Sequence, residues 1–306
     1  MKETGDDFVC FQQQPSQTRG DQMYYKVTTI VLWLFLPLTI VSMMEAQDFA
    51  LHTDAHPWPK ADADKEVTKL INAIKGQVNL EVFKPNQIKG LATWVKDHTK
   101  GGNSTLILTG ITPSTIYPIG NAKPDGSILE DFLDAGNTIF NTGEYTFYTS
   151  EGPQETNETK GLQNIIDVPL AHVWHVRGAD GWKEAPVEVT PTKEGKKYAP
   201  SLKKYGTSYP FHVKDYDGTA WKLEMALAEN TKEASRRVEP GVIFNQETGG
   251  RLGIFVQAYV GDIPHPGVSF GDIMSEFILN YHVPVTLAIE PADNLAVTWG
   301  EVKSSR

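Results

Sequence analysis

The sequence predicts an α/β domain built on a mostly parallel β-sheet. Short apolar runs of strand length alternate along the chain with longer segments in which apolar residues recur at helical spacing. The run at residues 105–108 is almost continuously apolar, which is typical of a strand covered on both faces, and residues 137–140 are expected to form a second buried strand. Strands that alternate with helices in this way favour a parallel, doubly wound sheet.

The regular part of this alternation covers residues 48–140. Each of its first two helices places four apolar residues at helical spacing, so each is expected to pack one face against the sheet. In chain order, the expected elements are strand 48–52, helix 64–75, strand 78–83, helix 86–98, strand 105–108, helix 127–135 and strand 137–140.

The second half of the chain is less regular. Residues 147–210, rich in Gly, Pro and His, are expected to form an irregular insertion with short helices at 162–166 and 192–198. The expected elements after it are strand 221–228, a hairpin with strands 241–245 and 251–256, and helix 272–281. The hairpin turn contains two glycines, which allow the positive φ of a tight turn. Residues 286–306 are expected to form a tail.

Composition limits the class of partner. The chain has 306 residues, of which 40% are hydrophobic and 22% charged, so it can bury a large core. Its formal net charge is −10, and it contains no basic run. A net acidic chain has no broad positive field to attract phosphate backbones, so no nucleic-acid partner is expected.

A hydrophobic segment at residues 27–44 resembles an export signal. Its first fifteen residues, 27–41, carry no charge, Lys26 precedes them, and small residues follow with an expected cleavage point after Ala46. The domain is therefore expected to be secreted or periplasmic. The alternative is a signal anchor that holds the domain outside the cytoplasm, although the run is shorter than the roughly 20 apolar residues of a membrane span.

The first 22 residues are polar and unlike the basic start of a signal. Met23 is therefore the expected initiator, residues 1–22 are expected to be untranslated or disordered, and residues 47–285 are expected to form the domain. Contact with a membrane is expected only through an uncleaved signal segment. The oligomeric state is not predicted.

Ligands of open parallel sheets bind beyond the carboxyl ends of the strands, so the loops there supply the candidate site. Glu144 follows a buried strand through a glycine, and its carboxylate is suited to general acid or base chemistry or to accepting a sugar hydroxyl. The alternative for Glu144 is a carboxylate that only stabilises a helix dipole. The other candidates lie in the loops or the insertion: catalytic Asp54 and His175, and ligand-binding His56, Thr112, Tyr145, Tyr148, Arg177 and His265.

Two further patterns receive structural interpretations. His172 and His175 would share a face on a helix, but their neighbours indicate extended chain, so no metal and no cofactor is expected. Residues 267–271 match the G-x-S-x-G pattern of a serine nucleophile, which requires a preceding strand that Pro264 and Pro266 disfavour. Ser269 or Asp272 is expected instead to cap the following helix.

A family resemblance rests on three segments. The sequences LILTG at 106–110, LEDFLDAGNTIFNTG at 129–143 and GGRLGIFV at 249–256 resemble the class I glutamine amidotransferase-like superfamily, and within it the ThuA-like, or trehalose-utilisation, branch. The resemblance covers roughly residues 49–281. It implies a flavodoxin-like three-layer sandwich with an irregular insertion and a C-terminal β-hairpin plus helix.

The chain departs from this family at the residues that carry its chemistry. Amidotransferases place a cysteine at the turn occupied here by Glu144, whereas the single cysteine of this chain is Cys10. The ThuA-like branch usually has Gly-x-His at this turn and Gly-His after the hairpin, where this chain has Val260, Gly261 and Asp262. Glutamine hydrolysis by a thiol is therefore not expected.

Three functions follow from these observations. The first is an exported domain that acts on or binds a carbohydrate or another small molecule, with Glu144 as acid or base. The second is a non-catalytic binding or interaction domain of the cell envelope, which the missing nucleophile and the aromatic loops favour. The third is a metal-dependent hydrolase. The sequence does not decide whether the protein is an enzyme.

Overall fold

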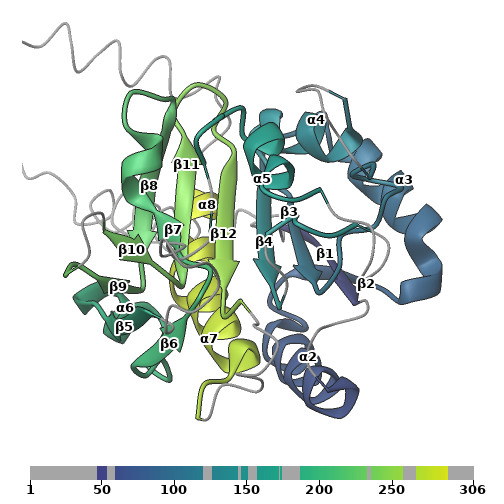
Figure 1. The fold of residues 1–306 in the computed structure, drawn as a ribbon. Helices are drawn as coiled ribbons and strands as arrows, with labels where there is room; N and C mark the ends of the chain where they lie inside the picture. The colour runs from purple at the N-terminus through teal and green to yellow at the C-terminus, as the bar shows by residue number, and fades with distance from the viewer. Residues whose placement is uncertain are drawn as a thin grey trace, which may run out of the picture. The chain divides into compact units, whose positions relative to one another are not determined.

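A computed structural model describes residues 47–53, 59–119, 126–143, 146–150, 157–171, 173, 187–232, 236–257 and 267–288 (Figure 1). In this part of the chain, a seven-stranded sheet has the order β2-β1-β3-β4-β12-β11-β8. The first five strands in this order are parallel, and β11 and β8 run antiparallel to their neighbours. The strands are β1 (Asp48–Thr53), β2 (Asn79–Phe83), β3 (Thr105–Thr109), β4 (Thr138–Thr142), β8 (Trp221–Ala226), β11 (Gly241–Asn245) and β12 (Arg251–Phe255). The predicted α/β class with a mostly parallel sheet is confirmed.

Helices cover both faces of this sheet. Successive strand residues point to opposite faces, so Ala50 of β1 joins one hydrophobic cluster while Phe49 and Leu51 join the other. The cluster that contains Ala50 also contains the buried side chains of α3 (Ile88–Asp97), α4 (Ile128–Asp134) and α5 (Lys160–Ile165). The opposite cluster contains those of α2 (Lys60–Ile74) and α7 (Phe270–Phe277). All residues of β3 and β4 are buried, as the apolar run at 105–108 predicts.

The helix ends follow local chemistry. The expected start of the first helix at residue 64 is wrong, because α2 begins at Lys60, directly after Pro59. A proline is tolerated there because the first N–H groups of a helix have no partner within it. Ser127 caps α4: its hydroxyl accepts a hydrogen bond from the Glu130 N–H, and the Glu130 carboxylate accepts one from the Ser127 N–H.

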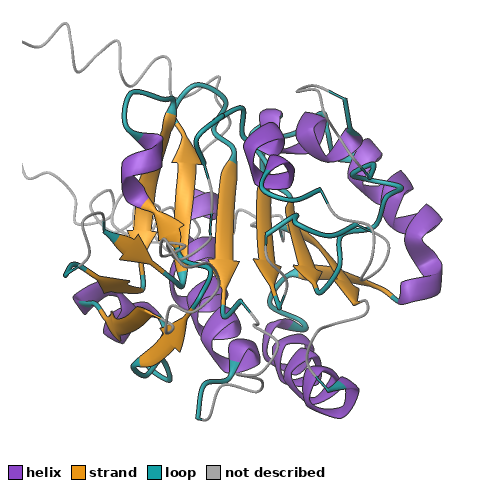
Figure 2. Ribbon diagram, in the orientation of Figure 1, coloured by secondary structure: helices purple, strands orange, loops and turns teal. Residues whose placement is uncertain are grey.

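A second, antiparallel sheet was not predicted (Figure 2). Its order is β6-β5-β9-β10-β7, and it lies partly in the segment expected to be an irregular insertion. Its strands are β5 (Val187–Pro191), β6 (Tyr205–Thr207), β7 (Phe211–His212), β9 (Ala228–Asn230) and β10 (Arg237–Val238), with α6 (Lys193–Tyr198) between β5 and β6. Strands of two or three residues are too short to show a hydrophobic period. The strand expected at 221–228 is divided at Leu227, because the chain passes there from β8 of the main sheet to β9 of the antiparallel sheet.

The last helical segment is longer than expected. α7 begins at Phe270, a π-helical turn follows at Ile278–His282, and α8 (Val283–Ala288) continues past residue 286, where the tail was expected to begin. Among the described residues, none of the helices has the length and apolar character needed to cross a bilayer.

Gly271 allows α7 to pack directly against α2. A Cβ atom on Gly271 would lie 2.2 Å from the carbonyl oxygen of Glu66, a distance that Cβ atoms do not adopt. The contact is with backbone, so no side-chain rotation can relieve it. Any larger residue must therefore push the two helices apart.

We expect Gly271→Ala to lower the free energy of unfolding by about 1–3 kcal/mol through this overpacking. Helix propensity alone would raise stability by about 1 kcal/mol, so the sign of the change separates the two effects. Chemical denaturation monitored by circular dichroism gives the measurement. Gly101→Ala is the control, because nothing lies within 4 Å of the corresponding Cβ. A Gly271→Ala variant as stable as the parent would contradict the contact.

Candidate functional site

Three parallel strands end in threonines that lie side by side. Thr53, Thr109 and Thr142 are the last residues of β1, β3 and β4, and they are register partners across the sheet. The Thr109 hydroxyl donates to the carbonyl oxygen of His52 at 3.1 Å. The Thr142 hydroxyl is buried and, among the described residues, has no hydrogen-bond partner. This row forms one side of the carboxyl edge of the sheet, where parallel α/β sheets bind ligands.

A glycine follows the threonine in both β3 and β4. Gly110 has a φ of 96° and Gly143 a φ of 79°, which side chains with a Cβ rarely adopt. The Gly110 N–H donates to the Thr142 carbonyl oxygen at 2.9 Å, so the two turns are joined. Both strands therefore end in the same Thr-Gly turn, and the loops that carry the predicted site residues start from it.

The residue before each threonine points to the opposite face of the sheet. His52, Leu108 and Asn141 form the preceding row on β1, β3 and β4. Because neighbouring strands lie about 4.8 Å apart, His52 and Asn141 are separated by roughly 10 Å. Both side chains are fully buried. In the described part of the chain, neither ring nitrogen of His52 has a hydrogen-bond partner, and the Asn141 side-chain nitrogen has no acceptor.

Burial keeps His52 neutral. Desolvation lowers the pKa of the His52 imidazole from 6.5 to about 4. At neutral pH the ring therefore offers one N–H donor and one nitrogen acceptor. Such a ring can bind a hydroxyl group in either direction without adding charge to the site.

The structure brings two of the predicted loops together. The Thr112 N–H donates to the carbonyl oxygen of Thr149 at 3.3 Å, and Thr112 forms an isolated parallel bridge with Ser150. Tyr148 lies in the same segment and is half-buried, and its carbonyl oxygen accepts a hydrogen bond from the Asn157 N–H. The Thr112 hydroxyl is fully buried and has no partner among the described residues. Thr112 and Tyr148 thus lie in adjoining segments, as their positions after β3 and β4 predict.

The turn after β4 has an unusual backbone. Thr146 has a φ of 49° and Phe147 a φ of 66°, and Val256, at the end of β12, has a φ of 44°. Positive φ values are outliers for β-branched residues such as threonine and valine, and they are often found at functional sites. The buried hydroxyl of Thr146 also lacks a partner in the described part of the chain.

Gln257 connects these two strained segments. Its side-chain nitrogen donates to the main-chain oxygen of Asn141 at 3.1 Å and to the side-chain oxygen at 3.2 Å. Its side-chain oxygen accepts from the Thr146 N–H at 3.2 Å. The Gln257 N–H in turn donates to Oε1 of Glu239 at 2.7 Å. A continuous set of hydrogen bonds therefore runs from Glu239 to the turn after β4.

Most of the sequence-predicted site lies outside the described residues. This applies to Glu144, Tyr145, Asp54, His56, His175, Arg177 and His265, and to His172 of the histidine pair. The residues that sequence reasoning missed are His52, Asn141, Thr142, Thr146, Glu239 and Gln257. The signal for the first three was a polar residue in the last two positions of an otherwise apolar strand. Among the described residues, no three His, Cys, Asp or Glu side chains gather as a metal ion would require.

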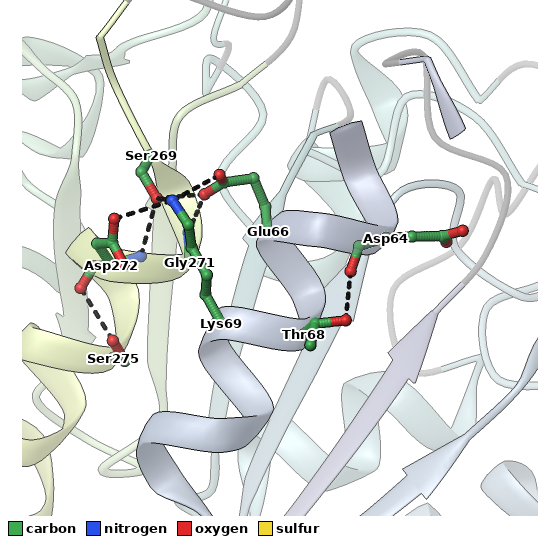
Figure 3. A network of polar contacts seen from close by, with 8 residues as sticks. All are labelled: Asp64, Glu66, Thr68, Lys69, Ser269, Gly271, Asp272 and Ser275. Carbon is green, nitrogen blue, oxygen red and sulfur yellow. Dashed lines mark hydrogen bonds and ion pairs between the residues drawn. The ribbon is translucent and has the colours of Figure 1, made fainter. Parts of the chain in front are cut away.

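Ser269 lies in a separate polar cluster between α2 and α7 (Figure 3). Its hydroxyl donates to Oε2 of Glu66, accepts from Lys69 Nζ at 2.9 Å and accepts from the Asp272 N–H at 3.2 Å. Lys69 Nζ also contacts the carboxylates of Glu66 at 2.9 Å and Asp272 at 3.0 Å. The hydroxyl therefore caps α7 and ties it to α2, as the interpretation of Ser269 as a cap predicts.

The charge of Lys69 argues against a nucleophilic Ser269. Desolvation lowers the pKa of Lys69, but the hydrogen bonds and charges of Glu66 and Asp272 outweigh it and raise the pKa above its ordinary value. The protonated amine cannot take the serine proton. In addition, Gly267, Val268 and Ser269 are not part of a strand, which the nucleophile elbow requires.

Comparison with known proteins identifies no relative. No protein-family model, no curated protein and no solved structure matches the chain.

We expect Ser269→Ala to lower the free energy of unfolding by about 1–2 kcal/mol, because the helix loses its cap and the cluster loses its central hydroxyl. Thermal unfolding of the variant beside Ser275→Ala tests this, since the Ser275 hydroxyl bonds only within its own helix, to the Asp272 carbonyl oxygen, in the contacts described. A fluorophosphonate probe should leave Ser269 unlabelled. Labelling that disappears in Ser269→Ala would show that the serine is nucleophilic.

The neutral state of His52 predicts a specific loss of stability in acid. The folded pKa is about 4 and the unfolded pKa 6.5, so the folded state resists protonation. The contribution of His52 to the free energy of unfolding is fully present above pH 6.5. It is lost as the pH falls towards 4, which lowers the free energy of unfolding by on the order of 3 kcal/mol. His52→Leu should remove this part of the pH dependence, measured as the difference in unfolding free energy between variant and parent from pH 7 to pH 4. A difference that stays constant over this range would contradict the prediction.

Proposed function

We propose that the chain is an exported, ThuA-like member of the class I glutamine amidotransferase-like superfamily that binds and acts on a carbohydrate without a cysteine nucleophile. Its proposed ligand site is the carboxyl edge of β1, β3 and β4. The fold assignment is supported by the order of the parallel strands, β2-β1-β3-β4-β12, because flavodoxin-like sheets have the same order, 2-1-3-4-5. The antiparallel pairing of β11 with β12, followed by α7, agrees with a closing hairpin and helix.

One observation carries the proposal of a ligand site. Buried polar atoms without a partner in the described part of the chain lie near this edge on His52, Thr112, Asn141, Thr142 and Thr146, with His52 and Asn141 on one face of the sheet and Thr142 on the other. Leaving a buried polar group unpaired costs about 1–3 kcal/mol, so such groups rarely occur together in one place without a role. A ligand whose own polar groups complete these hydrogen bonds would recover that free energy.

The chemistry of these side chains favours a neutral, hydroxyl-rich ligand. Three hydroxyls, one amide and one neutral imidazole can donate to or accept from sugar hydroxyls. None of the five carries a charge at neutral pH, so an ionic ligand would find no counter-charge among them. Glu144, three residues after Asn141 along the chain, supplies the carboxylate for acid or base catalysis in this proposal.

Export is part of the proposal. The uncharged segment at residues 27–41 and the small residue Ala46 at the expected cleavage point support a secreted or periplasmic location, where polysaccharides and their fragments are available.

A non-catalytic binding domain of the cell envelope is the second candidate. Its support is the absence of cysteine after Cys10, which removes the usual nucleophile of the superfamily. The two candidates share the proposed ligand site and differ at Glu144. Glu144→Gln separates them, because an enzyme would keep its affinity and lose turnover, whereas a binding domain shows no turnover in the parent either.

We expect Thr142→Val to weaken carbohydrate binding by about tenfold, because the isosteric valine removes one hydrogen bond to the ligand at a cost of about 1.4 kcal/mol. Screening on a glycan array identifies the carbohydrate, and isothermal titration calorimetry then measures the affinity. Thr68→Val on α2 is the matched control, since this exposed hydroxyl bonds only to the Asp64 carbonyl oxygen in the contacts described. Equal affinities for parent and Thr142→Val would place the ligand elsewhere.

A further inference from the structure

Glu239 is a fully buried carboxylate held by hydrogen-bond donors. Its Oε1 accepts from the Tyr205 hydroxyl at 3.1 Å and from the Gln257 N–H at 2.7 Å. Its Oε2 accepts from the Thr207 hydroxyl. In each of these contacts a partner donates to a carboxylate oxygen. An ionised carboxylate only accepts hydrogen bonds, whereas a protonated one must also donate. The surroundings of Glu239 are therefore built for the charged form.

These contacts join the two sheets. Tyr205 and Thr207 belong to β6 of the antiparallel sheet, whereas Gln257 follows β12 of the main sheet. Glu239 lies between β10 and β11, and its own N–H donates to the carbonyl oxygen of Ala228 on β9 at 3.1 Å. One side chain thus connects the antiparallel sheet to the main sheet.

From Gln257 the connection continues to the turn after β4. The Gln257 side chain binds both oxygens of Asn141 on one side of the turn and the Thr146 N–H on the other. Residues 142–145 lie between these two attachment points, and Glu144 is among them. The Gln257 side chain therefore ties Asn141 to Thr146, and the Gln257 backbone is in turn bonded to Glu239.

Protonation of Glu239 would break part of this arrangement. A proton on Oε1 would compete with the N–H of Gln257 and the hydroxyl of Tyr205. A proton on Oε2 would point at the Thr207 hydroxyl oxygen, which already accepts the Tyr209 N–H at 3.1 Å, and the Thr207 proton would lose its acceptor. The neutral acid thus leaves at least one donor unpaired in a buried site.

Burial and the donors act in opposite directions on this group. Desolvation raises the pKa of Glu239 from 4.5 to about 7, against the lowering effect of the hydrogen bonds from Thr207, Gln257 and Tyr205. Charged and titratable groups also lie on the strands around it in the described part of the chain: Tyr205 on β6, His212 on β7, Glu229 on β9 and Arg237 on β10. Among the described residues, none of the side chains that bond to the Glu239 carboxylate is a cation.

We propose that Glu239 is a positioning residue of the carboxyl edge: as a carboxylate it fixes Gln257 and thereby Asn141 and Thr146, and protonation on Oε1 weakens this connection. The geometry of the turn follows from the hydrogen bonds alone. Its consequence for ligand binding rests on the proposed function.

Backbone amide NMR of the domain tests the structural part without any ligand. We expect the Thr146 and Gln257 amide shifts of the parent to titrate together with a midpoint that reports the Glu239 pKa of about 7. Glu239→Gln should abolish this step at both amides. Glu247→Gln, which removes an exposed carboxylate in the turn between β11 and β12, should leave it unchanged. A Thr146 titration that persists in Glu239→Gln, or no titration in the parent, would overturn the proposal.

Thr207→Val provides a test that does not depend on the folding of Glu239→Gln. Removing this donor should raise the midpoint at both amides by roughly one pH unit, because the charged form loses a hydrogen bond worth about 1.5 kcal/mol or more. An unchanged midpoint in Thr207→Val would contradict the role of Glu239, because the Thr207 hydroxyl donates to the Glu239 carboxylate in the contacts described.

Carbohydrate affinity measured at pH 5.5 and pH 8.5 separates this proposal from the proposed function. If both hold, the parent binds more tightly at pH 8.5 and Glu239→Gln shows no such difference. If no carbohydrate binds at either pH while both amides titrate as described, the proposed function fails and the positioning role of Glu239 is supported. If binding is independent of pH and the amides do not titrate, the positioning role fails and the carbohydrate site is supported.

Discussion

The burial of β3 and β4 on both faces is the constraint on which the rest of the structure depends. Helices cover each face of these strands, so the side chains in the middle of each strand are apolar and the polar backbone groups pair with the neighbouring strands. Polar side chains enter this layer chiefly near the strand ends. Hydrogen-bonding chemistry is thereby concentrated at the carboxyl edge, where Thr109, Asn141 and Thr142 meet the loops. Among the described residues, Asn141 and Thr142 carry buried polar atoms without a hydrogen-bond partner at this edge.

Two of the polar clusters among the described residues differ in how completely their hydrogen bonds are satisfied. In the cluster of Glu66, Lys69 and Ser269, opposite charges meet and the serine hydroxyl both donates and accepts, so the cluster holds two helices together. At the carboxyl edge, the hydrogen bonds of Glu239 and Gln257 fix the backbone of a turn, while nearby hydroxyl and imidazole groups keep unused bonding capacity. A rigid frame around unsatisfied groups is the arrangement expected of a preorganised ligand site.

How far the sequence determines these features depends on the range of the interactions. The strands at 105–109 and 138–142 and the helices around them could be predicted because hydrophobic period and capping are local. The antiparallel sheet could not, since β7 and β10 have two residues each and exist only through pairing between distant segments. Thr112 and Tyr148 could be placed near the carboxyl edge because they follow strands, and their part in a site stays a prediction. His52 and Asn141 were missed because each continues a strand pattern, and Glu239 because its partners lie 18 to 34 residues away.

The paired Thr-Gly turns at Thr109-Gly110 and Thr142-Gly143 bear on which parts of the sequence can change without altering the sheet. The direction in which the chain leaves both strands is set by backbone conformation and by the hydrogen bond between Gly110 and Thr142, not by the sequence of the loops that follow. Insertions and substitutions beyond these glycines can therefore change the loops while the ends of β3 and β4 keep their backbone conformation. The two glycines thus mark the boundary between a backbone fixed by the sheet and loops whose sequence is free to vary.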